Sequence, residues 1–169
     1  MDRDIEIFRI TDFALAFNTI SEPQIAAAIC EDDTNPRIPD VVNEFWIGAN
    51  VDGKYIGCWR LHQVNMSTWW IHIFILPYAR KQGLDLIVSD QVMEWYLHNV
   101  PGLNVIMAAI PVIYENVHKH IMAQGAVVIG KLPGSFLKGG EYHDMWVYAD
   151  TRDNMLNNLE KRIEERKDK

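Results

Sequence analysis

The alternation of polar and apolar positions at the start of the chain predicts a strand over residues 4–10. Residues 12–32 carry apolar positions at helical spacing, interrupted near Ser21, Glu22 and Pro23. A proline is favoured in the first turn of a helix, and a serine just before it can accept a hydrogen bond from the unpaired N–H groups. We therefore expect two helices, the second beginning at Pro23 and capped by Ser21.

Three strands are expected next, after a polar loop over residues 32–40 that contains two prolines. Two of these strands flank Asp52-Gly53, a dipeptide typical of a tight hairpin. The third, residues 67–77, is almost entirely apolar, which predicts a central position in a sheet. A helix over residues 84–99 follows, and its inward stripe is expected to contain Leu84, Val88, Val92 and Trp95.

The last third of the chain continues the alternation of strands and helices. Residues 103–110 predict a strand that ends at Pro111, and residues 113–125 predict a short helix that Gly125 closes. The order of elements up to this point is that of an α/β (α+β) protein with a mixed sheet.

Two further strands, residues 126–132 and 141–150, are expected to be joined by the turn-rich segment 133–140. The tail, residues 151–169, predicts a charged amphipathic helix whose apolar stripe contains Met155, Leu156, Leu159 and Ile163. We expect one domain over residues 1–150, followed by this helical tail, which either packs on its own domain or docks to a partner or a second copy.

Composition narrows the class of protein. The chain is 49% hydrophobic and 23% charged with a net charge of −7, and its first 50 residues hold ten acids and three bases. No basic face with interleaved aromatics is present, which argues against nucleic-acid binding. No apolar run reaches the roughly 18 residues that a membrane-spanning helix needs. Cys30 and Cys58 lie in apolar segments without metal-ligand spacing, so we expect reduced thiols in a cytoplasmic protein and no metal site.

Candidate chemistry gathers in IFILPYARKQGLDLIV, residues 73–88. An apolar strand ends at a proline, two basic residues and a glycine follow, and a helical pattern begins. The first N–H groups of a helix have no partner within it and carry the positive end of its dipole. A glycine there lets a phosphate approach the backbone. The segment is therefore either a phosphate-binding turn or an ordinary strand-to-helix turn with solvated charges.

This turn resembles the signature of the GCN5-related N-acetyltransferase (GNAT) family. That signature reads apolar residue, any residue, Pro, two residues, Arg or Gln, two residues, Gly, one residue, and Gly or Ala, and residues 75–85 read ILPYARKQGLD. A second family mark, an asparagine at the start of the next helix, is matched by Asn116. The resemblance runs from about Asp4 to Asp150 and implies a mostly antiparallel central sheet flanked by helices.

The resemblance implies acetyl-CoA as co-substrate. The pyrophosphate would lie on the N–H groups of the turn, the end of the central strand would splay from its neighbour and hold the pantetheine and thioester, and the asparagine would face the cofactor. The cofactor-binding residues implied are Phe74, Ile75, Leu76, Arg80, Lys81, Gln82, Gly83, Leu84, Asp85 and Asn116.

One position departs from the family pattern, because Asp85 stands where Gly or Ala is expected. A carboxylate about 4 Å from a phosphate charge costs on the order of 4 kcal/mol at an effective dielectric constant of about 20. Asp85 is also favoured in the first turn of a helix, whose N–H groups it can cap. It therefore either occupies the phosphate position or turns to solvent and leaves the turn open.

Acetylation of an amine needs a base for the ammonium proton and an acid for the departing thiolate. His72 on the central strand and Glu115 are the candidate bases; as an alternative, His72 is an ordinary core or interface residue. His118 and His120, two apart on a helix, point in different directions and are expected at the surface. Family members often use a tyrosine after the asparagine, but here Tyr114 precedes Asn116 and no tyrosine follows on that helix.

Two functions from different classes stay open. The first is an acetyl-CoA-dependent N-acyltransferase acting on an amine of a small molecule or of a protein. The second is a non-catalytic GNAT-fold binding or assembly protein. Residues 72–80 and 116–126 are similar to phage-encoded acetyltransferase-like proteins, some linked to virion heads or internal virion components, which would place the chain in a host cytoplasm or a virion. The acidic first third favours a cationic amine as acceptor.

Overall fold

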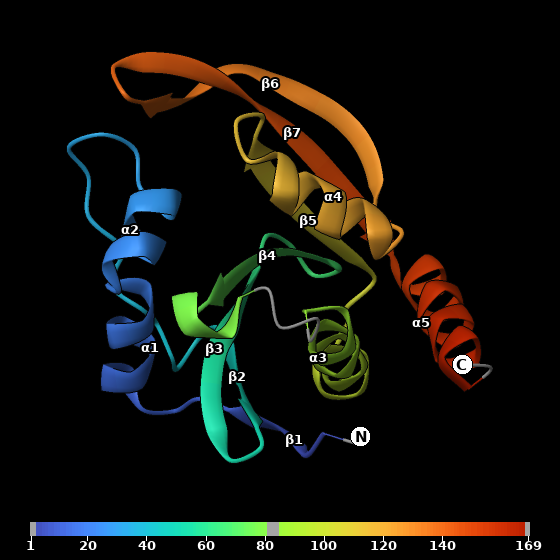
Figure 1. Ribbon diagram of the computed structural model, residues 1–169. Helices are drawn as coiled ribbons and strands as arrows, with labels where there is room; N and C mark the ends of the chain where they lie inside the picture. Colours follow the sequence, from blue (N-terminus) through green and yellow to red (C-terminus); the bar gives the residue numbers. More distant parts are fainter. Residues whose placement is uncertain (1–2, 81–84, 168–169) are drawn as a thin grey trace. The chain divides into compact units, whose positions relative to one another are not determined.

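The computed structural model describes residues 3–80 and 85–167 (Figure 1). The chain divides into two compact units. Unit 1 consists of Met1–Gln63 and Ile71–Val92, and unit 2 consists of Val64–Trp70 and Met93–Lys169. Each unit is described by itself.

Seven strands are hydrogen-bonded in the order β1-β2-β3-β4-β5-β7-β6, so β4 is the central strand, as its apolar sequence predicts. Their bounds are β1 (Ile5–Arg9), β2 (Phe45–Val51), β3 (Lys54–Gln63), β4 (Thr68–Ile75), β5 (Val105–Pro111), β6 (Val127–Lys138) and β7 (Glu141–Thr151). β4 pairs with β5 in parallel over residues 68–70, whereas β1–β2, β2–β3, β5–β7 and β6–β7 are antiparallel. This mixed, mostly antiparallel sheet with helices confirms the predicted fold class.

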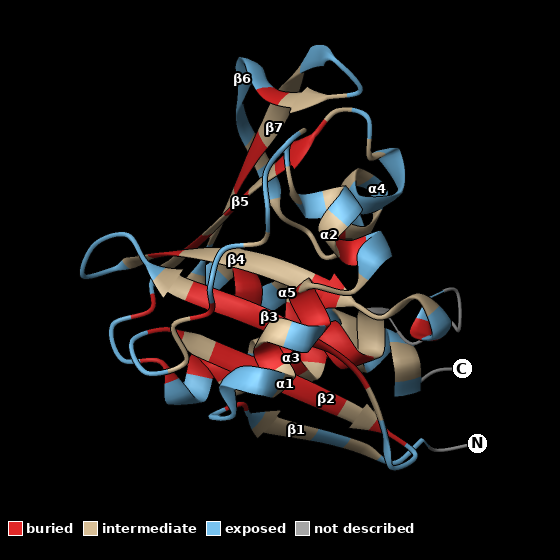
Figure 2. Cartoon of the chain, turned by 90° about the vertical axis from the view of Figure 1, so that its left-hand side faces the viewer, coloured by how far each residue is buried: buried red, intermediate tan, exposed pale blue. Residues whose placement is uncertain are grey.

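In unit 1, helices α1 (Phe13–Ile20) and α2 (Pro23–Ile29) pack on the sheet through a buried apolar cluster. Figure 2 shows long buried stretches along β2 and β3. The buried members of the cluster are Ile10, Ala16, Ile20, Ile25, Trp46, Cys58 and Phe74.

The predicted cap of α2 was wrong by one residue. Because the helix begins at Pro23, the capping position falls on Glu22, whose carboxylate accepts hydrogen bonds from the N–H groups of Gln24 and Ile25 at 2.9 and 3.0 Å. Ser21 instead ends α1, where its N–H donates to the carbonyl of Phe17. The side chain of a glutamate is long enough to accept hydrogen bonds from both of these N–H groups.

The predicted hairpin between β2 and β3 is confirmed. Asp52 and Gly53 have φ angles of 52° and 73°, as the tight two-residue turn between twisted strands requires. The Asp52 carboxylate is also bound by Arg3, at 2.5 Å from its Nη1 atom, and by the N–H of Asp4. These contacts attach the start of the chain to the hairpin.

Helix α3 (Asp85–Asn99) follows β4 after residues 81–84, which lie outside the described residues. Its first half belongs to unit 1 and its second half to unit 2. Val88 and Val92 of the predicted inward stripe are buried, and Trp95 is half-buried. Leu84, the first member of the stripe, is among the residues not described.

In unit 2 the segment 133–140 was wrongly predicted as a loop, because β6 continues through it to Lys138. The register jumps from Leu132 opposite Met145 to Phe136 opposite His143, so three residues of β6 bulge out. Pro133 has no N–H for the ladder, and a bulge accommodates it. The turn itself is formed by Gly139 and Gly140, with φ angles of 63° and 77°.

Two helices complete unit 2. Helix α4 (Glu115–Ala123) ends as predicted at Gly125, whose φ of 90° is the left-handed conformation that closes helices. Helix α5 (Arg152–Lys167) buries Met155 and Leu159 of its predicted stripe. None of the helices in the described part of the chain has the length and apolar character needed to cross a membrane.

Candidate active site

The predicted cofactor turn begins where β4 ends. The N–H of Leu76 donates to the carbonyl of Ile56 on β3 at 2.9 Å. The chain then forms one short 3₁₀ helix, η1 (Pro77–Ala79). Exposed Arg80 follows, and its Nε donates to the carbonyl of Ile75 at 3.0 Å. The backbone groups of successive residues in a strand point to opposite edges, so the carbonyl of Ile75 points away from β3 when the N–H of Leu76 points toward it. The Arg80 side chain therefore folds back along the edge of β4 that faces away from β3.

The remaining predicted residues of the turn are only partly described. Lys81, Gln82, Gly83 and Leu84 lie outside the described residues, and so does the side chain of Asp85. The backbone of Asp85 begins helix α3, which agrees with its expected place in a first helical turn.

Strand β3 approaches the end of β4 closely. Gly57 has a φ of 146°, and a Cβ atom at this position would lie 2.2 Å from the carbonyl oxygen of Phe74. The hydroxyl of Tyr78 in η1 donates to the carbonyl of Tyr55, and Lys54 Nζ lies 3.9 Å from the centre of the Tyr78 ring. These contacts attach the exit of β4 to β3, so the start of the turn is firmly positioned.

A ladder of four nearly parallel rings runs along one face of β2, β3 and β4, formed by Trp46, Phe74, His72 and His62. Successive ring centres are 5.9, 6.2 and 5.4 Å apart, with interplanar angles of 18°, 2° and 14°. Period-two alternation places Phe74 and His72 on the same face of β4. His72, the predicted catalytic base, therefore points to the face that α1 and α2 cover.

Both histidines of the ring ladder are electrically neutral at ordinary pH. Burial, together with the charge of Arg60, lowers the pKa of His72 to about 3, and the same two causes lower the pKa of His62. Among the described residues, neither His72 Nε2 nor His62 Nδ1 has a hydrogen-bond partner, although both atoms are buried. A ring with so low a pKa stays neutral, with one nitrogen as a hydrogen-bond donor and the other as an acceptor, and holds a second proton poorly.

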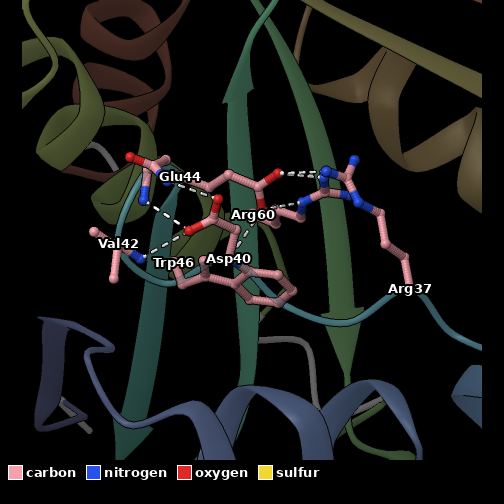
Figure 3. A network of polar contacts seen from close by, with 7 residues as sticks. Arg37, Asp40, Val42, Glu44, Trp46 and Arg60 are labelled. Atoms are coloured by element: carbon pink, nitrogen blue, oxygen red, sulfur yellow. Dashed lines mark hydrogen bonds and ion pairs between the residues drawn. The ribbon is translucent and has the colours of Figure 1, made fainter.

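A buried ion pair lies beside the ring ladder (Figure 3). Arg60 donates Nε and Nη2 to the two carboxylate oxygens of Glu44, at 2.7 and 2.5 Å, and Trp46 Nε1 donates to Glu44 at 3.2 Å. Burial acts to raise the pKa of Glu44, but the hydrogen bonds and charge of Arg60 outweigh it and hold this pKa below its usual range. Glu44 is therefore ionised and fully engaged.

The loop before β2 is attached to the same pair. The exposed guanidinium of Arg37 lies 3.7 Å from Glu44, and the Asp40 carboxylate accepts hydrogen bonds from the N–H groups of Val42 and Asn43 (Figure 3). This loop contains the polar segment 32–40 of the sequence pattern.

The other predicted residues belong to unit 2. Asn116 and Glu115 are exposed in the first turn of α4, and Glu115 lies 3.9 Å from Lys119. His118 was expected at the surface but is half-buried, because its Nδ1 lies 2.5 Å from the hydroxyl of buried Tyr148. Burial raises the pKa of Tyr148, so this hydroxyl keeps its proton.

Sequence reasoning missed the Glu44–Arg60 pair and the His118–Tyr148 contact. The first depends on the pairing of β2 with β3, which places Arg60 opposite Trp46 and which the sequence alone does not give in register. The second joins positions 30 residues apart, and no local pattern indicates it. Within the described residues, no group of three or more His, Cys, Asp or Glu side chains is arranged to hold a metal ion.

The architecture is shared with solved acetyltransferase structures, although no family model and no curated protein matches the sequence. Spermidine N-acetyltransferase from Vibrio cholerae, in complex with CoA and spermine, superposes with a TM-score of 0.75 at 17% identity, covering 92% of this chain and 98% of that chain. The chain has the GNAT fold.

Two further structures of the spermidine/spermine N-acetyltransferase SpeG from Vibrio cholerae agree with this assignment. A mutant form has a TM-score of 0.74 at 14% identity, covering 90% of this chain and 96% of its own. A complex with manganese ions has a TM-score of 0.72 at 15% identity, covering 90% and 95%.

Proposed function

We propose that this protein is an acetyl-CoA-dependent N-acetyltransferase. The observation that carries the proposal is the passage from the central strand β4 through η1 into α3, built on the signature residues 75–85 in a chain with the GNAT fold. Its attachment to β3 through Tyr78 and Gly57 supports a preformed turn, which costs less ordering when a ligand binds.

The proposed cofactor site uses both backbone and side chains. The phosphates would accept hydrogen bonds from the N–H groups of residues 81–85, with charge from Arg80 and Lys81. Asn116 would face the cofactor from α4. The N–H of Leu76 points to β3 and donates to it. Successive backbone N–H groups of a strand point to opposite edges, so the N–H of Ile75 points to the other edge of β4. It is the proposed donor to the thioester carbonyl.

The reaction would transfer an acetyl group in one step. The lone pair of the neutral amine attacks the thioester carbon, a C–N bond forms, the C–S bond breaks, and the thiolate leaves with the electron pair. The amine nitrogen loses one proton and the thiolate gains one, so charge and atoms balance. A bound thioester supplies the activated acetyl group; the protein binds, orients and moves the proton.

His72 and Glu115 stay the proposed catalytic residues. The pKa of about 3 at His72 favours a role as a neutral hydrogen-bonding group that orients the amine over one as a proton store. Glu115 is exposed to water and can pass a proton to solvent directly. The orienting role is supported if kcat/KM of the wild type is constant above pH 5 and if this constant value is lower in the His72→Phe variant.

The proposed acceptor is a cationic amine. The net charge of −7 and the acidic first third of the chain favour positively charged partners. The similar structures are spermidine and spermine acetyltransferases, one of them with spermine bound, which makes polyamines the first acceptors to assay.

A non-catalytic binding or assembly role, such as a phage head or internal virion component, is the second candidate. Asp85 in place of Gly or Ala and the absence of a tyrosine after Asn116 in α4 favour it. In this role the carboxylate of Asp85 would occupy the phosphate position of the turn.

Calorimetric titration of acetyl-CoA into the wild type, Asp85→Gly and Asp153→Gly separates these candidates. Asp153 lies in the first turn of α5. Asp153→Gly therefore changes the net charge and the start of a helix as Asp85→Gly does, but outside the proposed cofactor turn. We expect the wild type and Asp153→Gly to bind equally, and Asp85→Gly to bind more tightly by up to about three decades.

Binding by Asp85→Gly alone would favour the assembly role, with a turn that its own aspartate fills. The absence of heat from all three proteins would contradict the proposed function. Acetylation of spermidine, followed by release of the CoA thiol, is the assay that completes the test.

A further inference from the structure

Helix α4, which carries Asn116, has few anchors of its own. It is nine residues long, its buried residue is Ile121, and Tyr114 at its N-cap makes no side-chain capping hydrogen bond. Helices this short are only marginally stable in isolation, so their position depends on contacts with the rest of the fold.

The C-terminal helix supplies such contacts at the far end of α4. The Nδ2 atoms of Asn154 and Asn158 donate to the carbonyl of Gly125 at 3.1 and 3.3 Å. Arg162 Nη1 donates to the carbonyl of Gln124 at 2.5 Å. Carbonyls at the end of a helix have no partner within it, so α5 satisfies groups that α4 leaves open. We call these three donors and two carbonyls the α5 clasp.

The spacing of the donors is that of one helix face. Asn154, Asn158 and Arg162 are four residues apart and lie beside the buried stripe of Met155 and Leu159. Apolar packing therefore fixes α5 in unit 2, and the neighbouring polar stripe is carried to the end of α4.

Gly125 fits the same arrangement. Its φ of 90° disfavours other residues, and a Cβ atom there would lie 2.3 Å from Nδ2 of Asn158. The glycine thus ends α4 and also leaves the space that Asn158 needs.

We propose that the α5 clasp positions α4 so that Asn116 is presented to the cofactor. This inference rests on the proposed function, in which Asn116 faces acetyl-CoA. Asn154, Asn158 and Arg162 are positioning residues, since they act through the helix and touch no substrate. The C-terminal helix is then part of the cofactor-binding machinery although it contributes no ligand to the cofactor.

The test compares two double variants of α5 with the same change in net charge. Asn158→Leu with Arg162→Met removes two donors of the clasp, whereas Asn157→Leu with Lys161→Met changes the adjacent exposed positions. Amide hydrogen exchange in α4 is expected to become roughly tenfold faster in the first variant and to stay unchanged in the second. The Kd for acetyl-CoA is expected to rise about fivefold in the first variant alone.

A cycle with Asn116→Ala distinguishes positioning from a general loss of stability. If the clasp acts through Asn116, removing it in the Asn116→Ala background should weaken acetyl-CoA binding no further. Arg162→Lys keeps a donor at the end of α5 and should retain most of the wild-type affinity.

Unchanged exchange in α4, or a clasp effect that adds in full to that of Asn116→Ala, would overturn the proposal. If the wild type itself does not bind acetyl-CoA, the proposed function fails, and the exchange experiment still decides whether α5 orders α4. A variant too unstable to assay is replaced by the single change Asn158→Leu, to which the same two outcomes apply.

Discussion

At the scale of single residues, Asp150 behaves differently from the other carboxylates of unit 2. Burial raises its pKa to about 6, although the hydrogen bond from Asn154, at 2.5 Å, and the charge of Arg162 oppose the shift. In the unfolded chain the pKa of an aspartate lies near its ordinary value of 3.8. Between about pH 4 and 6 the folded state therefore holds a proton that the unfolded state has lost, and stability falls as pH rises through this window.

Replacing Asp150 with Asn should remove this cost. The full shift would be worth about 3 kcal/mol, and solvent screening around a half-buried carboxyl reduces it to about 1 kcal/mol. We expect Asp150→Asn to stabilise the protein by that amount at pH 7.5 and to have no effect at pH 4, where the wild-type carboxyl already carries its proton. Urea unfolding at the two pH values measures both.

Asp144 provides the matched control, because its environment acts in the opposite direction. The hydrogen bond from Lys131, at 2.6 Å, and that from the N–H of Gly134 lower the pKa of Asp144. Its contribution is present above its unfolded pKa and is lost as pH falls. Asp144→Asn should therefore destabilise the protein at pH 7.5, and equal effects of the two substitutions would contradict this account.

At the scale of elements, the contact between β3 and β4 depends on one glycine. Gly57→Ala would bring Cβ to 2.2 Å from the carbonyl of Phe74, in a backbone conformation that alanine rarely adopts. Neither atom belongs to a flexible side chain, so the strands must separate. We expect a loss of roughly 3 kcal/mol in the free energy of unfolding. If the proposed function is correct, acetyl-CoA binding should weaken as well, because β3 contacts the start of the proposed cofactor turn.

Gly130→Ala on β6 is the control for that substitution. Nothing lies within 4 Å of the Cβ position of Gly130, and its φ is not in the left-handed region. We expect a change of at most about 0.5 kcal/mol in stability. Similar losses for the two alanine variants would show that the tight approach at Gly57 is not what stabilises the sheet.

Most elements could be predicted because each has a local cause. The alternation over residues 4–10 gave β1, Asp52-Gly53 gave the hairpin, and the apolar run gave the central strand β4. The segment 133–140 failed because proline and glycine usually mark turns, whereas here the paired strand β7 keeps β6 extended around a bulge. Strand pairing is a non-local cause that a short window does not contain.

At the scale of the whole molecule, the sequence predicts a cofactor turn but not its surroundings. The spacing of Pro77, Arg80 and Gly83 is the basis of that prediction, and alternation along β4 places His72 on one face. The low pKa of His72 depends on Arg60 and on burial by other elements, so it could not be read from neighbours in the chain. The Glu44–Arg60 pair likewise requires the β2–β3 pairing to be known.

The net charge of −7 gives the whole molecule a long-range attraction for cations. If the acceptor is a polyamine, KM for spermidine should rise about threefold between low salt and 0.5 M NaCl, because screening shortens the range of this attraction. KM for a neutral aromatic amine is the control and should change little. A KM for spermidine that does not respond to salt would contradict a cationic acceptor.

Strand β6 lies at the end of the strand order, with Val127 and Ile129 more than half exposed, at 53% and 56%. Unpaired edge strands of this kind can recruit strands of other molecules and begin aggregation. The register of β6 shifts between Val128 and Gly130, and again at the bulge after Leu132, where Pro133 lacks an N–H, so a foreign strand finds only short regular stretches along that edge. The irregularity that made this segment look like a loop thus also limits how far concentrated solutions of the protein can stack into fibres.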